Sequence, residues 1–300
     1  MCVMKDGGLS IELRVAGWFL GPALSVVLIF QLMPAGAAFL LSLTDFDLYT
    51  FAAPDTLRIV GLRNYQMLLQ DGRFWLALRN TLYFVGLGGV LTLGLSLGTA
   101  LWLNQRFVRF RALLRTVYFA PVVTTLVAVA IVWRYIYHAR YGLLNQGLQL
   151  LGLEPVDWLG DPRWALPSLV LMAVWKNYGY SLLIFMAALQ AVPEELYDAA
   201  RIDGADLWQQ FRHVTLPTLR PVVLLTGLVT ANGYFQVFAE PYVMTGGGPL
   251  DATLTMVLLL YDQGFRWWRL GYAAALAFVL FVLMLLLSAV LLRLQREAQR

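Results

Sequence analysis

The chain has 300 residues, of which 60% are hydrophobic and 13% are charged, and its formal net charge is +4. A typical soluble domain carries roughly 25% charged residues. This composition excludes a disordered chain, a secreted disulfide scaffold and an ordinary soluble enzyme, and it indicates a membrane protein with several spans. The single cysteine, Cys2, cannot form an internal disulfide. Because the basic residues form no aromatic-interleaved patch, we expect no nucleic-acid partner.

Six apolar stretches are long enough to cross the roughly 30 Å hydrocarbon core of a bilayer. In chain order they cover residues 15–43, 80–103, 116–133, 165–189, 221–243 and 270–292. Lipid leaves no other way to satisfy an open backbone, so the pattern predicts an all-α polytopic membrane protein with six transmembrane helices. The first stretch is much longer than the roughly 7–15 apolar residues of a cleavable signal peptide. We therefore expect it to be a retained span.

The distribution of basic residues predicts the orientation of these spans. Six spans place both termini on one side of the membrane, together with the 104–115 and 193–220 loops. These segments hold 12 of the 22 Lys and Arg residues. By the positive-inside rule, we expect both termini in the cytoplasm. The predicted parts are a cytoplasmic tail over 1–14, a transmembrane domain over 15–292 and a second cytoplasmic tail over 293–300.

The chain lacks the motifs that would let it hydrolyse ATP or bind catalytic zinc. A phosphate-binding P-loop needs a lysine after glycine, but the two lysines, Lys5 and Lys176, follow Met and Trp. The two histidines, His138 and His213, lie in different loops, and no H-E-x-x-H motif is present. We therefore expect a non-catalytic chain without a metal or cofactor of its own.

Residues 193–220 form the most patterned loop of the chain. A proline followed by two glutamates at 193–195 predicts the start of a helix, and Gly204 predicts its end. A second helix is expected over about 205–213, with Pro217 as its end. Two interpretations of this helical hairpin remain open: it docks a cytoplasmic partner, or it packs on the end of the bundle itself.

This loop resembles the E-A-A…G…L-P loop found in permease subunits of binding-protein-dependent ABC importers. The matching residues are Asp198, Ala199, Ala200, Asp203, Gly204, Leu216 and Pro217. The resemblance extends over most of the chain and is closest to carbohydrate permeases of the maltose-transporter type. Further similar segments cover 60–65, 73–81, 158–162, 174–176 and 245–249. Asp198 departs from the pattern, because the family usually has a glutamate there.

The resemblance implies a type I ABC importer permease fold in the plasma membrane of a bacterium or archaeon. It implies that the chain passes a sugar, a mono- or oligosaccharide, from an extracytoplasmic binding protein into the cytoplasm. The 193–220 loop would be the coupling helix that docks on a separate ATPase. The implied partners are two ATPase subunits, which bind ATP and Mg²⁺, a second permease, the sugar-binding protein and membrane lipid.

Alternatives to a sugar importer are a permease of the same family with a glycerol-phosphoester cargo, an ion-coupled secondary transporter, and an intramembrane enzyme. A phosphoester would need a cationic path, for which Lys176 alone is little support. A secondary transporter would use Lys176 or Glu240 and would need inverted repeats, which the sequence does not show. An intramembrane enzyme would need a nucleophile–base pair or a metal set, and neither is visible.

Polar residues inside the spans are candidates for the substrate path. Asn232, Gln236 and Glu240 recur at every fourth residue, so we expect them on one face of the fifth helix. Lys176 and Tyr180 in the fourth span complete the candidate set, with Lys176 pairing with Glu240 or with a carbonyl group. These side chains either line a path for a neutral polyol or hydrogen-bond between helices.

Overall fold

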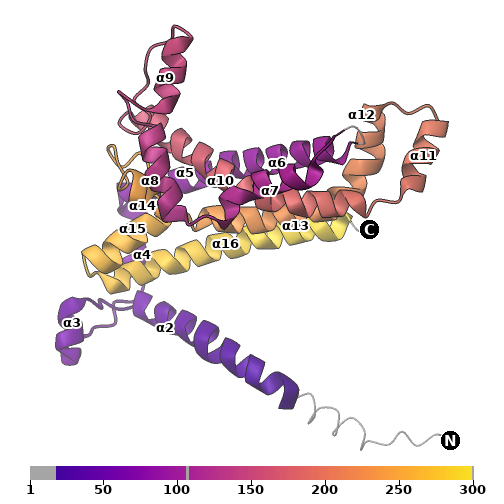
Figure 1. The fold of residues 1–300 in the computed structure, drawn as a ribbon. Helices are drawn as coiled ribbons and strands as arrows, with labels where there is room; N and C mark the ends of the chain where they lie inside the picture. Colours follow the sequence, from indigo (N-terminus) through magenta and orange to yellow (C-terminus); the bar gives the residue numbers. More distant parts are fainter. Residues whose placement is uncertain (1–17, 106–107, 299–300) are drawn as a thin grey trace, which may run out of the picture. The chain divides into compact units, whose positions relative to one another are not determined.

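The computed structural model describes residues 18–105 and 108–298 of the chain (Figure 1). In this part of the chain the regular structure is helical, apart from an isolated bridge between Thr44 and Ile59. Five helices are long and apolar enough to span a bilayer, and a bent helix pair makes a sixth. The predicted all-α architecture is therefore confirmed. The tail predicted over 1–14 lies outside the described residues.

The chain divides into two compact units, residues 1–68 with 263–278 and residues 69–262 with 279–300. The helices of the first unit are Trp18–Ser42, which ends as α2 (Met33–Ser42), α3 (Leu48–Ala52), most of α4 (Arg63–Gln70) and the start of α16 (Leu270–Ala298). The buried amide of Asn64 donates 2.8 Å hydrogen bonds to the carbonyl oxygens of Ser42 and Thr44. These two bonds give backbone carbonyl groups a donor at the point where the chain leaves the first span.

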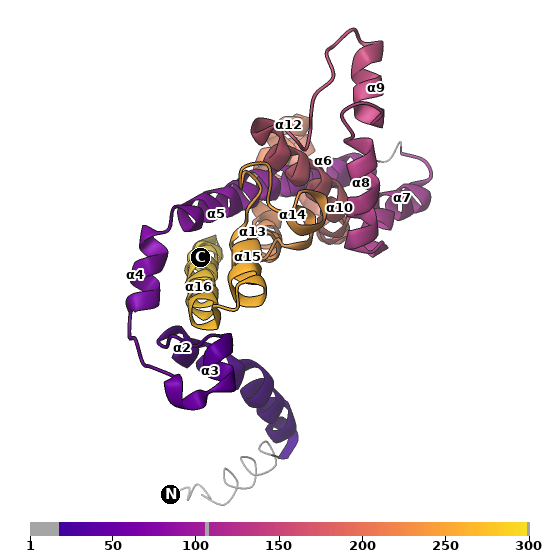
Figure 2. The same cartoon turned by 90° about the vertical axis from the view of Figure 1, so that its left-hand side faces the viewer.

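The second unit is a bundle of long helices with shorter helices at its ends (Figures 1 and 2). Its elements are α5 (Gly72–Tyr83), η3 (Phe84–Gly88), α6 (Gly89–Asn104), α7 (Arg111–Val123), α8 (Leu126–Ile136), α9 (Leu143–Leu150), α10 (Pro162–Gln190), α11 (Glu194–Ile202), α12 (Leu207–Gln210), η4 (Phe211–Thr215), α13 (Leu216–Phe235), α14 (Ala239–Met244), α15 (Met256–Tyr261) and the remainder of α16. Helices α11 and α12 lie at one end of this bundle and α9 lies at the other.

Helix α10 is the central helix of the second unit and packs against α6, α7 and α13. It starts at a capping residue, Asp161, whose carboxylate accepts a 2.9 Å hydrogen bond from the Arg163 backbone N–H. This bond lowers the pKa of the Asp161 carboxyl below its usual value. About half of the residues of α10 are buried, including Leu169, Ala173 and Leu182, because neighbouring helices cover several of its sides.

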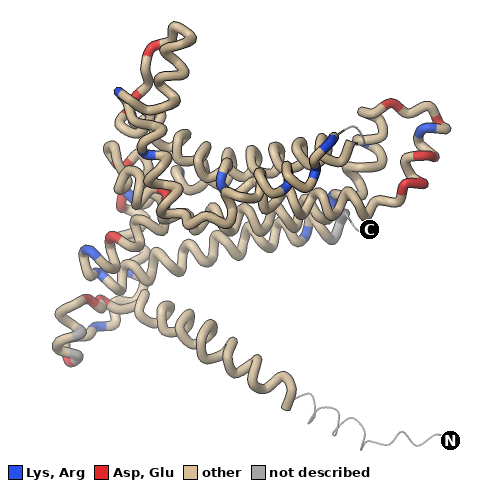
Figure 3. The backbone as a smooth tube through the Cα atoms, viewed as in Figure 1, with Lys and Arg blue, Asp and Glu red and all other residues tan. Residues whose placement is uncertain are grey.

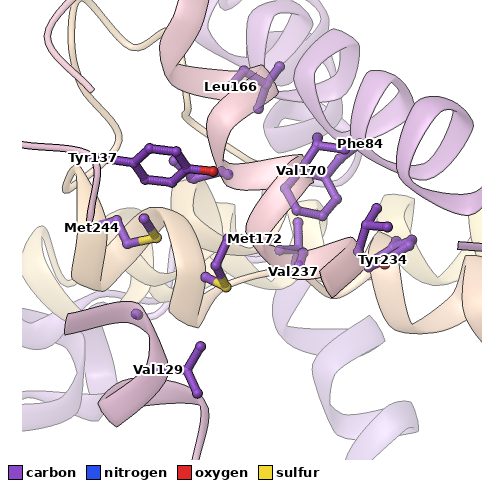
Figure 4. Close-up of a cluster of buried hydrophobic side chains, with 13 residues drawn as sticks. Phe84, Val129, Tyr137, Leu166, Val170, Met172, Tyr234, Val237 and Met244 are labelled. Atoms are coloured by element: carbon purple, nitrogen blue, oxygen red, sulfur yellow. The ribbon is translucent and has the colours of Figure 1, made fainter. Parts of the chain in front are cut away.

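Two apolar cores hold these helices together. The first lies along the first half of α10 and includes Phe84, Tyr137, Met172 and Tyr234 (Figure 4). The second is nearer to α11. Its buried residues are Ala100, Leu103, Leu182, Phe185, Met186, Leu189, Val192 and Leu219. Tyr197 of α11 and Val214 of η4 pack against this second core, so the 193–220 segment is anchored to the bundle.

The boundaries of two predicted spans differ from the structure. The second span is a continuous helix over Gly72–Asn104, and so it begins eight residues before the predicted start at residue 80. The predicted third span is wrong as a single straight helix, because α7 and α8 meet at a bend of 99°. Proline at position 121 and two threonines at 124 and 125 stand at this bend, which explains why the helix does not continue.

Candidate functional site

The bend between α7 and α8 is held by a lysine from α10. The Lys176 ammonium group donates hydrogen bonds to the carbonyl oxygens of Pro121 at 3.1 Å, Val122 at 3.4 Å and Thr124 at 2.9 Å. A lysine has three N–H donors, so all of them are used at the bend. Of the two partners left open by the sequence, carbonyl groups are therefore the ones that Lys176 contacts directly.

Helix α7 passes very close to α10 three residues after Lys176. A Cβ atom on Gly179 would collide with the backbone carbonyl oxygen of Tyr118. On the same stretch, the Ser96 hydroxyl of α6 donates a 2.7 Å hydrogen bond to the carbonyl oxygen of Tyr178. A glycine at position 179 is therefore needed for the close packing of α7 against α10.

A second interruption separates α13 from α14. Helix α13 ends at Phe235, residues 236–238 are not helical, and α14 begins at Ala239. The prediction that Asn232, Gln236 and Glu240 share one face of a continuous helix is therefore wrong. The Asn232 amide instead donates a 2.9 Å hydrogen bond to the Leu228 carbonyl oxygen, one turn earlier in its own helix.

A half-open cavity of about 470 Å³ lies beside this second interruption. Residues from α6, α7, α8, α10, α13 and α14 line it: Thr92, Val122, Leu126, Asn177, Tyr180, Ser181, Val229, Thr230, Gly233, Tyr234, Gln236, Val237, Phe238, Ala239 and Glu240. Three of the five predicted path residues, Tyr180, Gln236 and Glu240, are among them. Lys176 and Asn232 are not among the lining residues.

The cavity also contains polar groups that the sequence pattern did not single out. The Tyr234 hydroxyl lies 2.7 Å from the Thr92 hydroxyl and links α13 to α6. Asn177 lines the cavity, and its amide donates a 2.9 Å hydrogen bond to the Ala173 carbonyl oxygen. Its position directly after Lys176 was the available signal for this residue, whereas the role of Thr92 depends on how the helices pack.

The 193–220 segment folds as a helical hairpin at the end of the bundle. Gly204 has a φ of +79°, the left-handed conformation in which a side chain is strained. The Ala205 backbone N–H donates a 2.9 Å hydrogen bond to the Ala200 carbonyl oxygen, which closes the end of α11. Asp206 and Gln209 then form a capping box that starts α12. The predicted helix end at Gly204 is confirmed.

Pro217 does not end the second helix of the hairpin. Helices α12 and α13 are joined through the π-helical turn η4, so one helix runs through the predicted boundary. Proline lacks a backbone N–H and crowds the preceding turn of an α-helix. The wider π turn directly before Leu216 and Pro217 accommodates this defect, and the Thr218 hydroxyl donates a 2.7 Å hydrogen bond to the Val214 carbonyl oxygen.

The outer surface of the hairpin combines charged and apolar side chains. Figure 3 shows acidic and basic residues gathered on α11, in contrast to the middle of the long helices. Asp198 forms a 2.7 Å ion pair with Arg201. The Ile202 side chain is 87% exposed and that of Leu207 is 78% exposed. Helix α11 itself has no buried residue. Most of this surface therefore has no partner within the described residues.

At the opposite end of the second unit, the turn after α14 is fixed by residues of α5. The Arg73 guanidinium contacts both carboxylate oxygens of Asp251, at 2.9 and 3.1 Å. The buried Asn80 amide donates hydrogen bonds to the carbonyl oxygens of Asp251 and Leu254, at 3.2 and 3.0 Å. Residues 73–81, which are similar to a family signature, thus bind the segment that follows the second similar stretch, residues 245–249.

No metal centre is visible in the part of the chain that the structure describes, where no three His, Cys, Asp or Glu side chains are close enough to hold an ion. The second unit has two candidate functional features. One is a polar cavity beside two helix interruptions, and the other is the projecting hairpin. A helix bundle interrupted at a central cavity is typical of a membrane transport protein, since an irregular backbone inside a membrane is tolerated where it is buried in protein or lines a cavity.

Comparison with known proteins defines the class. Residues 90–300 match the family described as "Binding-protein-dependent transport system inner membrane component", and the chain belongs to this family. It is 37% identical over 273 residues to the probable ABC transporter permease protein YurN of Bacillus subtilis, covering 90% of this chain and 92% of that protein. The chain is thus an inner-membrane permease subunit of an ABC importer, a non-catalytic translocation component that works with ATPase and binding-protein partners.

Two further relatives have names that include a sugar. The chain is 34% identical over 294 residues to the lactose transport system permease protein LacF of Rhizobium radiobacter, covering 96% of each protein. It is 36% identical over 296 residues to the trehalose/maltose transport system permease protein MalF of Thermococcus litoralis, covering 97% of this chain and 98% of that one.

A solved structure has the same fold. A chain of a bacterial alginate ABC transporter, crystallised with a periplasmic protein that carries an alginate pentasaccharide, superposes with a TM-score of 0.81. The match covers 98% of this chain and 97% of that one, at 22% identity. The type I ABC importer permease fold implied by the sequence is therefore confirmed.

Proposed function

We propose that this permease passes a saccharide across the membrane through the cavity between α6, α10, α13 and α14. The observation that carries this proposal is the composition of the cavity wall, where the amides of Asn177 and Gln236 and the carboxylate of Glu240 lie with the rings of Tyr180 and Phe238. Amide and carboxylate groups exchange hydrogen bonds with hydroxyl groups, and aromatic rings cover the apolar faces of a sugar. The relatives LacF and MalF, which match almost the whole chain, support this cargo.

The hairpin of α11 and α12 is proposed as the site where a cytoplasmic ATPase docks. Its candidate residues are Asp198, Ala199, Ala200, Asp203, Gly204, Leu216 and Pro217. An exposed apolar surface next to small residues suits docking into a cleft of a partner. Tyr197 connects this surface to the bundle, because its hydroxyl group lies 2.9 Å from the Thr215 hydroxyl in η4. Movement of the hairpin with the ATPase would thus be transmitted directly to α13, whose far end borders the cavity.

The complete importer is proposed to contain two ATPase copies, a second permease chain and an extracytoplasmic sugar-binding protein. ATP and Mg²⁺ would be bound by the ATPase subunits. Both termini of this chain and the hairpin would lie in the cytoplasm, as the basic residues of the 104–115 loop indicate. The second permease would cover apolar residues that are exposed in this chain, such as Val90 on α6 and Val229 on α13, at 71% and 50%.

Purification of the tagged chain in mild detergent from its own membranes tests the assembly. We expect a co-purifying ATPase at two copies per complex, a second six-span chain, and ATPase activity. A chain that came down alone, without ATPase activity, would contradict the proposal. In the assembled complex, saccharides added with the binding protein should stimulate ATP hydrolysis and enter proteoliposomes.

The substitution Gly204→Arg tests the hairpin as the coupling element. It should abolish saccharide uptake, because it puts a strained and bulky residue at the bend of the docking surface. Gly152→Arg is a matched control, since Gly152 is also an exposed glycine with positive φ and with open space around its Cβ position, but lies after α9. The control should retain the ATPase subunits. Normal uptake in Gly204→Arg would refute the coupling role.

A further inference from the structure

We infer that the cavity selects its cargo by charge: it accepts neutral and cationic saccharides and rejects anionic ones, because of the carboxylate of Glu240. The saccharide part of this inference rests on the proposed function, whereas the charge preference stands on the cavity alone. Under this charge preference, the cavity accepts neutral sugars and amino sugars and rejects uronates, sulfonated sugars and glycerol phosphoesters.

Glu240 dominates the electrostatics of the cavity wall. Glu240 is only 6% exposed, and it lines the cavity. Among the described lining residues it is the one acidic side chain, and none is Lys or Arg. The other polar groups, including Asn177 and Gln236, are neutral amides and hydroxyl groups. A single carboxylate in a wall that no basic side chain lines gives that wall a negative potential.

Lys176 is the one cationic side chain within the fourth and fifth spans, and its ammonium group is turned to other partners. Its three N–H donors are used by the carbonyl oxygens of Pro121, Val122 and Thr124 at the α7–α8 bend. Lys176 is 7% exposed and does not line the cavity. It interacts electrostatically with Glu240, but it forms its hydrogen bonds at the bend and offers no donor to a cargo.

The consequence for a cargo follows from the sign of this charge. A carboxylate, sulfonate or phosphoester group in the cavity would face Glu240 without a compensating cation in the cavity wall, and like charges repel each other. A sugar hydroxyl group instead donates a charge-assisted hydrogen bond to the carboxylate. An ammonium group on an amino sugar would be attracted more strongly still. The structure thus gives no support to the glycerol-phosphoester alternative.

Charged thiol reagents can measure the sign of this potential in the assembled complex. In a Cys2→Ser background, Ala239→Cys places a single thiol of this chain in the cavity wall beside Glu240. Its reaction rates with a cationic trimethylammonium methanethiosulfonate and an anionic sulfonate analogue are compared in the detergent-solubilised complex. Gln149→Cys on the exposed surface of α9 gives the reference ratio. We expect the cation-to-anion ratio in the cavity to exceed the reference by about tenfold or more.

Two variants assign this ratio to Glu240. Glu240→Gln should bring it down to the reference value. Gln236→Lys, which leaves Glu240 in place and adds a cation to the same wall, should lower it as well and serves if the first variant does not assemble. A ratio equal to or below the reference, or a high ratio that neither variant changes, would overturn the inference.

Protection by saccharides connects the potential to the cargo. Glucosamine, glucose and glucuronate are used as probes to protect the thiol at position 239 from a neutral maleimide. The first two should protect at lower concentration than glucuronate, and Glu240→Gln should remove this difference. Stronger protection by glucuronate would overturn the inference. If the charge ratio holds and no saccharide protects, the saccharide cargo fails while the charge preference stands.

Discussion

The Lys176 ammonium group of α10 donates a 2.9 Å hydrogen bond to the carbonyl oxygen of Thr124, at the bend where α7 passes into α8. Carbonyl groups at a helix break inside a membrane have no water to bind, so they need a donor from the protein. Lys176 supplies donors to Thr124 and to two further carbonyls. A charged residue in an apolar helix is thus explained by the break that it stabilises in a neighbouring helix.

The first prediction concerns this lysine. Lys176→Met should destabilise the folded chain by on the order of 2–3 kcal/mol, because it removes the hydrogen bonds that a buried charged group donates to carbonyl groups at the bend. The measurement is the midpoint of thermal unfolding of the purified complex, followed by size-exclusion chromatography after heating. Lys176→Arg retains donors and should recover part of the loss. An unchanged midpoint in Lys176→Met would mean that the bend does not depend on this side chain.

The second prediction uses the close approach of α7 and α10. Gly179→Ala should lower stability by about 1–3 kcal/mol or more, because the added methyl group meets the Tyr118 carbonyl oxygen in a rigid backbone. Gly98→Ala on α6 is the matched control, since a Cβ atom there meets nothing within 4 Å. In the control the higher helix propensity of alanine should leave stability unchanged or slightly increased. Equal effects of the two substitutions would show that helix packing at Gly179 is looser than described.

The sequence predicted the number and order of the spans because long apolar runs have few alternatives in lipid. It did not predict where helices are interrupted. Proline at 121 was visible, but prolines at 167 and 221 lie inside continuous helices. Whether a proline breaks a helix depends on the groups that satisfy the freed carbonyls, and these come from distant segments.

Only part of the candidate site could be predicted from the sequence, again because the positions of helix interruptions and helix contacts depend on distant segments. Gln236 and Glu240 were found as polar residues in an apolar run, but the argument from a continuous helical face was wrong, because the helix stops between them. Tyr180 lines the cavity and Asn232 bonds to its own helix. Thr92 could not be found from a local pattern, since only the packing of α6 against α13 brings it to Tyr234.

The third prediction compares two polar links between α5 and the turn after α14. Arg73 and Asp251 form a two-point ion pair, but their side chains are 41% and 37% exposed. A double-mutant cycle with alanine at both positions should therefore give a coupling energy of no more than about 1 kcal/mol.

The neighbouring amide should be the more important link. Asn80 is 2% exposed and donates to two carbonyl groups. Asn80→Leu should thus cost about 1–3 kcal/mol, because it leaves these acceptors without a partner. Both values are obtained from unfolding midpoints of the complex in the same detergent. A coupling energy of the ion pair larger than the cost of Asn80→Leu would contradict this order.

The fourth prediction tests the hairpin surface without straining its backbone. Ile202→Glu places a charge on a side chain that is 87% exposed at the end of α11, so folding of this chain should be unaffected. A charge in an apolar docking surface must be desolvated on binding, and we expect the recovery of the ATPase with the tagged permease to fall by about tenfold or more. Leu150→Glu on α9 is the matched control, because Leu150 is 89% exposed and lies at the other end of the bundle. The control should retain the ATPase in full. Equal recovery of the ATPase with both variants would place its docking surface elsewhere than on Ile202.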